Sequence, residues 1–169
     1  MLRVLALLAV LAGCSVVAVP DMGPRVAGLV PDSGGLQPAG SDLRIDFGRD
    51  KAGVVEAVSR VLGARPGSDV VNAECGAGPV NTVSWDGLDL TFMDGDFLGW
   101  IVDDPALAVA GGLRVGQTRA ALEAAGAGPF RDTSLGVEFE SGGVFGLLET
   151  DEGDAPVTLL WSGLTCFFR

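Results

Sequence analysis

Residues 45–54 read IDFGRDKAGV, and residues 113–122 read LRVGQTRAAL at an offset of 68 residues. Each stretch leads from a strand-like pattern through a glycine to a residue that caps helices, Asp50 in the first and Thr118 in the second. Helical spacing of aliphatic residues then continues until Gly63 and Gly126, since glycine commonly ends helices. The two stretches therefore predict two copies of a strand, a turn and a short amphipathic helix.

Strand patterns follow the first predicted helix. Residues 82–85 and 88–93 flank Asp86-Gly87, which is a strong hairpin signal, and Asp94-Gly95 leads into a third strand at 96–102. These features predict a three-stranded antiparallel meander.

A similar series follows the second predicted helix. Residues 136–139 echo 87–90, residues 144–147 echo 97–100, and further strands are expected at 157–161 and 164–168. The predicted fold class is α+β, with two tandem units that each pack a short helix on an antiparallel β-meander. The first repeat is expected at 42–110 and the second at 111–169.

The N-terminus has the layout of a secretory signal. Arg3 precedes an apolar run, and residues 11–14 read Leu-Ala-Gly-Cys. These four residues resemble the lipobox of bacterial lipoproteins, which implies a signal peptide at 1–13 and a lipidated Cys14 as the mature N-terminus. The protein is then expected to be lipid-anchored at the cell membrane, on the extracytoplasmic side. The alternatives are ordinary cleavage or an uncleaved anchor helix over 4–19, which is shorter than the roughly 20 residues that span a bilayer.

Residues 14–41 are expected to form the lipidated N-terminus and a flexible tether. The segment contains Pro20, Pro24, Pro31 and Pro38 and has no sustained period. The alternative is that residues 26–30 dock on the folded domain, because they are largely apolar.

Charge and residue usage exclude several function classes. Without residues 1–13 the chain has 10 basic and 22 acidic residues, which disfavours binding to nucleic acid or to anionic lipid. The chain has no histidine and no tyrosine, so it lacks the commonest general base and the usual zinc ligand. No enzyme activity and no cofactor are expected.

Two cysteines remain besides Cys14. Cys75 and Cys166 form an even pair in an oxidising compartment and are expected to form a disulfide. Because they lie in different predicted repeats, this bond would lock the repeats together.

The tandem pattern at 45–54 and 113–122 resembles the β-lactamase inhibitor protein and the small outer-membrane assembly lipoproteins that share its repeat. The resemblance implies a concave, non-catalytic protein-binding surface on the paired sheets. The inhibitor's binding face is rich in tyrosine, which this chain lacks, and its disulfides lie within repeats. Inhibition of β-lactamase is therefore not part of the expectation.

Acidic loops and tryptophans supply the candidate binding residues. The loops at 94–96, 103–104 and 151–154 are explained by turn chemistry, with calcium binding as the alternative. The partner-binding surface is expected to use residues on the open sheet face and its rim: Asp89, Asp94, Asp96, Trp100 and Glu138. Trp100 would serve there as an outward apolar anchor, with core packing as the alternative. Core packing is expected for Trp85 and Trp161, with a binding anchor as the alternative.

The function expected from these features is a non-enzymatic protein-binding or envelope-assembly module. Its partner would be another envelope protein with a basic or mixed-charge surface. The alternative is a small-molecule or metal-ion carrier, which would need a pocket between the repeats.

Overall fold

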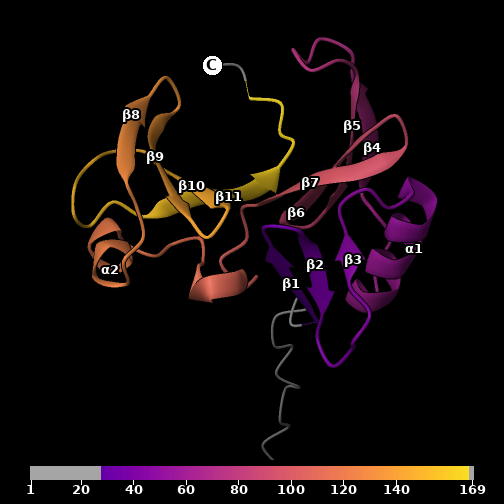
Figure 1. The fold of residues 1–169 in the computed structure, drawn as a ribbon, viewed down its shortest axis with the longest axis horizontal. Coiled ribbons are helices and arrows are strands. Elements are labelled where there is room, and N and C mark those ends of the chain that lie inside the picture. Colours follow the sequence, from indigo (N-terminus) through magenta and orange to yellow (C-terminus); the bar gives the residue numbers. More distant parts are fainter. Residues whose placement is uncertain (1–27, 168–169) are drawn as a thin grey trace, which may run out of the picture.

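The computed structural model describes residues 28–167, which form a large sheet, a small sheet and short helices (Figure 1). The predicted signal peptide, Cys14 and the tether residues before 28 lie outside the described residues. Among the residues described, no helix has the length and apolar character needed to span a membrane.

Eight strands form one antiparallel sheet in the order β4-β5-β6-β7-β11-β10-β9-β8. Their bounds are β4 Ser68–Asn72, β5 Val80–Trp85, β6 Leu88–Met93, β7 Asp96–Val102, β8 Phe130–Thr133, β9 Gly136–Ser141, β10 Val144–Leu148 and β11 Val157–Gly163. The two halves join where β7 pairs with β11, from Leu160 opposite Val102 to Gly163 opposite Gly99. Figure 1 shows a curved sheet whose outer strands, β4 and β5 on one side and β8 and β9 on the other, rise around the β7–β11 centre.

The first meander matches the prediction. β5, β6 and β7 are joined by the two expected turns, in which Gly87 has a φ of 74° and Asp94 a φ of 54°. Leu88, Leu90 and Phe92 point to one face and are buried in the core. The outer strand β4 is an addition that the sequence did not indicate.

The second half contains the strands expected at 136–139, 144–147 and 157–161, within β9, β10 and β11. The sequence echo between 87–90 and 136–139 nevertheless joins strands at different positions in the sheet. Residues 88–90 lie in β6, the third strand from one edge, whereas residues 136–139 lie in β9, the second strand from the other edge. The two halves also differ in their connections, since β10 and β11 are separated by eight residues and β6 and β7 by two. The strand expected at 164–168 is also absent from its described part, where residues 164–167 form no strand.

Both helices begin at the predicted caps. α1 (Lys51–Leu62) starts after Asp50, whose Oδ1 accepts hydrogen bonds from the backbone of the first turn, and it ends at Gly63 with a φ of 63°. α2 (Arg119–Ala124) starts after Thr118, whose Oγ1 accepts the backbone N–H of Ala121. A short 3₁₀ turn, η1 (Ala110–Gly112), lies between the two halves. The caps explain why two short helices with few buried residues begin where they do.

The tether prediction is wrong for residues 28–41. β1 (Leu29–Asp32) and β2 (Gly35–Pro38) form a hairpin, and β3 (Ile45–Asp46) completes a three-stranded antiparallel sheet. Leu29 and Leu36 are 2% and 0% exposed, so burial in the core holds a segment whose prolines suggested a linker. Pro31 is compatible with β1 because β1 is an edge strand.

The core lies on one side of the large sheet. The small sheet, α1 and α2 all lie on the convex side in Figure 1. Their buried residues, such as Leu29, Val58 and Leu122, belong to the same core cluster as residues of the large sheet, such as Phe92 and Leu160. The concave side is crossed by the C-terminal segment (164–167) as it leaves β11 (Figure 1). One face of the large sheet thus forms the core, and among the described residues the other carries only the C-terminal segment.

Candidate functional site

A row of cross-strand neighbours defines the concave face. The pairing registers place six residues in one line across six strands: Ser84, Asp89, Ile101, Trp161, Phe145 and Glu140. Directly paired residues project to the same side of a sheet, and these alternate along their strands with core residues such as Leu88 and Val144. The row therefore marks the face opposite the core.

Trp100 does not lie on this face. Its side chain is 0% exposed, and its Nε1–H donates to the backbone oxygen of Asp32 at 2.7 Å. A register irregularity between Thr91 and Phe92 shifts the alternation along β7, so that both Phe97 and Trp100 enter the core. The prediction of Trp100 as an outward anchor is wrong, and the core alternative holds.

Asp94 and Asp96 are exposed at the turn between β6 and β7. The turn lies beside the start of α1, because the backbone N–H of Lys51 donates to Gly95 O at 2.8 Å and Asp50 bridges to Asp96. This position is at the rim of the sheet, as expected, but it belongs to the entrance of the helix.

Asp89 and Glu138 do lie on the concave face. Asp89 is on β6 and Glu138 is on β9, so they occupy different positions within their halves of the sheet. The expectation that they are equivalent is therefore wrong, although both face the same side.

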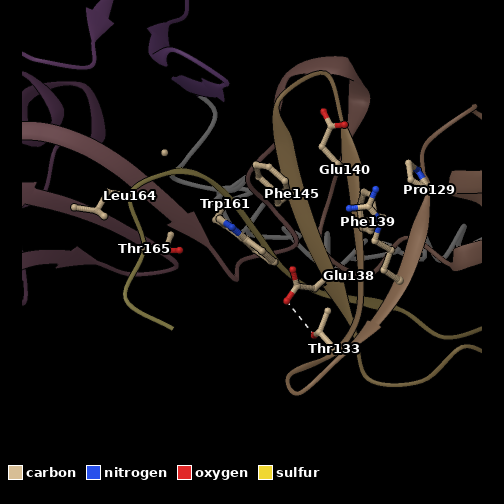
Figure 2. A pocket seen from close by; sticks show the side chains of 11 residues that line it. Pro129, Thr133, Glu138, Phe139, Glu140, Phe145, Trp161, Leu164 and Thr165 are labelled. Carbon is tan, nitrogen blue, oxygen red and sulfur yellow. Dashed lines mark hydrogen bonds between the residues drawn. The ribbon is translucent and has the colours of Figure 1, made fainter. Parts of the chain in front are cut away.

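A cleft of about 550 Å³ opens in the second half of the concave face (Figure 2). Trp161 and Phe145 form apolar surface in it, with ring centroids 5.9 Å apart in a stacked arrangement. Glu138 and Glu140 come from β9, and Leu164 and Thr165 come from the C-terminal segment. Phe145 is 39% exposed, whereas Trp161 is 3% exposed. Of these two aromatic side chains, Phe145 is thus the one that is exposed to solvent.

Hydrogen bonds position the carboxylates of the cleft. Thr133 Oγ1 donates to Glu138 Oε1 at 3.0 Å, and the backbone N–H of Gly143 donates to Glu140 Oε1 at 2.7 Å. Arg131 lies directly opposite Glu138 in the β8–β9 register. The cleft therefore combines an apolar floor with oriented acidic groups and one basic residue at its wall.

The C-terminal segment forms the other wall and is held at several points. Leu164 N–H donates to Leu98 O at 2.8 Å, and Thr91 Oγ1 donates to Leu164 O at 2.6 Å. The predicted disulfide joins Cys166 to Cys75, with the two Cα atoms 5.6 Å apart. Phe167 packs edge-on against Trp161 at 5.0 Å. This segment covers the centre of the concave face and leaves the cleft beside it.

Phe145 and Trp161 were not among the residues expected to bind the partner. Their signal was present, since each lies next to a residue that is buried in the core, Val144 and Leu160. Alternation alone places them on the face opposite those residues, but it does not say which face is covered.

The described residues do not gather three metal-binding side chains of the Asp, Glu or Cys type in one place. The acidic loops make local bonds: Asp104 Oδ1 accepts from Ala106 N–H at 2.7 Å, and Glu152 O accepts from Ala155 N–H at 3.0 Å. These bonds fit the turn interpretation of the loops.

Two carboxylates that bind basic side chains, Asp32 and Asp69, lie away from the cleft, on β1 and β4. The hydrogen bond from Arg44 holds the pKa of Asp32 below its usual range, and the hydrogen bonds from Lys51 and Asn81 do the same for the pKa of Asp69. The first pair joins β1 to the residue before β3, and the second joins α1 to β4, so both connect separate segments of the fold.

Comparisons with family models, with curated proteins and with solved structures find no match to this chain, so the resemblance to the β-lactamase inhibitor protein stays a prediction.

Proposed function

We propose that this chain is a bacterial lipoprotein of the cell envelope that binds another protein on its concave sheet face. The binding is non-enzymatic, and the partner surface is basic or of mixed charge. The observation that carries the proposal is the cleft beside Phe145, where an accessible aromatic ring lies next to the carboxylates of Glu138 and Glu140. Aromatic side chains in such settings commonly dominate binding energy, and rim charges set specificity.

The acidic balance of the chain supports this choice of partner. The formal net charge is -11, so a basic surface is attracted and an acidic one is repelled. An exposed interface of this kind weakens as salt screens the rim charges.

We further propose that the fold consists of two tandem units related by duplication. Three backbone hydrogen bonds tie the entrance of α1 to β7: Gly48 N–H to Phe97 O at 2.7 Å, Phe97 N–H to Arg49 O at 2.8 Å, and Lys51 N–H to Gly95 O at 2.8 Å. Three matching bonds tie the entrance of α2 to β11: Gly116 N–H to Val157 O at 2.8 Å, Val157 N–H to Gln117 O at 2.8 Å, and Arg119 N–H to Ala155 O at 2.9 Å.

The matched bonds support a two-fold relation between the halves. The helix-side residues are offset by 68 positions and the strand-side residues by 60 in the two sets. The same offset of 60 separates Ile101 from Trp161, which face each other where β7 pairs with β11. The axis of the two-fold relation would therefore pass between Ile101 and Trp161, where the concave faces of the two halves meet.

The N-terminal pattern supports the location. Acylation of Cys14 would hold the protein at the membrane, since two or more buried acyl chains anchor a protein stably. The binding face would then act on the extracytoplasmic side.

The proposal is tested by recovery of partners from detergent-solubilised envelopes of the native host. Full chains with Phe145→Ala and with Leu43→Ala are compared, because Leu43 is 78% exposed and is a matched exposed apolar residue away from the cleft. Phe145→Ala should reduce recovery of specific proteins several-fold, and Leu43→Ala should leave it unchanged. Equal recovery with both variants would contradict the proposed face.

One observation favours a second function, a small-molecule or metal-ion carrier. The cleft volume of about 550 Å³ lies in the range of small-molecule sites. A ligand that binds the folded chain raises its melting temperature, so a thermal-shift screen with metabolites and divalent ions separates this function from protein binding.

A further inference from the structure

The outer strand β4 is unusually exposed for a strand with aliphatic residues. Val70 is 59% exposed and Val71 is 61% exposed, and as consecutive residues they point to opposite faces of the sheet. In residues 28–167 no strand pairs with the outer edge of β4. Both apolar side chains are therefore exposed, on an edge whose outer backbone groups have no strand partner in these residues.

The opposite edge of the sheet is protected. β8 carries the exposed charged residues Arg131 and Asp132, and its Phe130 packs on Phe139 with ring centroids 5.5 Å apart. Charged residues on an edge strand discourage pairing with another strand. The β8 edge thus has exposed charges that oppose the addition of a strand, whereas the β4 edge has exposed aliphatic side chains.

The one charged residue of β4 does not protect its edge in the same way. Both carboxylate oxygens of Asp69 bind Lys51 Nζ, at 2.9 and 2.7 Å, and Oδ1 also accepts from Asn81 Nδ2 at 2.7 Å. These donors belong to α1 and β5, so the carboxylate is drawn toward the body of the protein.

We propose that β4 is a second docking site, which accepts an extended basic segment of a partner protein as an additional antiparallel strand. Strand addition takes its affinity from backbone hydrogen bonds and its specificity from alternate side chains. The segment would place β-branched residues beside Val70 and Val71, on the two faces of the sheet. Its basic residues would face Glu74 and Asp86, which are exposed after β4 and after β5.

The charge of the chain selects a basic partner segment over a second copy. Two copies would each carry a formal net charge of -11 and would repel one another.

The test is amide NMR of the full chain, ¹⁵N-labelled in detergent micelles, with the heptapeptide acetyl-Lys-Val-Thr-Val-Thr-Val-Lys-amide. The control peptide has proline at positions 4 and 5, because only alternate N–H groups of a strand face its partner, so one of two neighbouring prolines removes a ladder hydrogen bond in either register. The heptapeptide should give saturable shift changes centred on β4 and β5 and slower exchange of β4 amides, and the proline peptide should not. The double variant V70S/V71S should bind about tenfold more weakly, because two apolar cross-strand pairs are lost. Leu43→Ser should bind like the wild type.

Four results would overturn the proposal. Shift changes centred on β8 or on the cleft would place the peptide elsewhere, and equal binding of the proline peptide would exclude a strand ladder. Absence of saturable binding at millimolar peptide would also overturn it. Concentration-dependent shifts at β4 without peptide would assign the edge to a second copy of the chain.

Discussion

Removal of the disulfide should destabilise the chain strongly, because Cys75 and Cys166 are separated by 91 residues. In the chain-entropy description, a loop of this length stabilises the folded state by about 4.6 kcal/mol at about 25 °C. The double variant C75S/C166S should therefore lose about 4–5 kcal/mol of unfolding free energy. Its urea m-value should rise, since the unfolded chain without the cross-link exposes more surface.

The assay is equilibrium unfolding in urea at neutral pH, followed by the fluorescence of Trp85, Trp100 and Trp161. Oxidised and reduced wild-type protein serve as controls, and the reduced protein should match C75S/C166S. A loss below about 1 kcal/mol would refute the reasoning, because it would mean that the cross-link does not restrict the unfolded chain.

Three further changes test other parts of the structure. Trp100→Phe should lower the unfolding free energy by about 1–3 kcal/mol in the same urea assay, because Asp32 O loses its buried donor. Asp32→Asn tests the bond from Arg44. Because the pKa of Asp32 is lowered in the folded chain, the stabilising effect of the Asp32 carboxylate is complete above about pH 4 and is lost as the pH falls further. The melting curves of wild type and variant should therefore converge in acid. Cys14→Ala should abolish incorporation of radiolabelled palmitate, and unchanged labelling would exclude lipidation of this residue.

Local turn chemistry made much of the fold predictable. Asp86-Gly87 and Asp94-Gly95 define turns by their conformational preferences, and Asp50 and Thr118 start helices through their own side chains. These signals act within a few residues and do not depend on the tertiary structure.

Features that depend on distant contacts were missed. β1 and β2 contain Pro31 and Pro38 and are stable because Leu29 and Leu36 are buried in a core made by other segments. β4 is exposed on both faces and so has no hydrophobic period to detect. Such elements are determined by their tertiary contacts.

The candidate site was only partly predictable for the same reason. The orientation of Trp100 depends on the register irregularity between Thr91 and Phe92, which sequence alternation does not reveal. The cleft at Phe145 depends on the path of the C-terminal segment, which the disulfide and the bonds of Leu164 determine. The sequence predicted a binding surface on the open sheet face, whereas the proposed place of that surface and its aromatic residue Phe145 depend on the tertiary structure.

The central claim is that the cleft beside Phe145 contacts a protein in the envelope. A photo-crosslinking amino acid placed at position 145 in intact cells tests it most directly, with position 43 as the matched exposed control. The account predicts discrete light-dependent adducts from position 145 that are absent from position 43. Adducts from position 43 alone, or the same adducts from both positions, would contradict it.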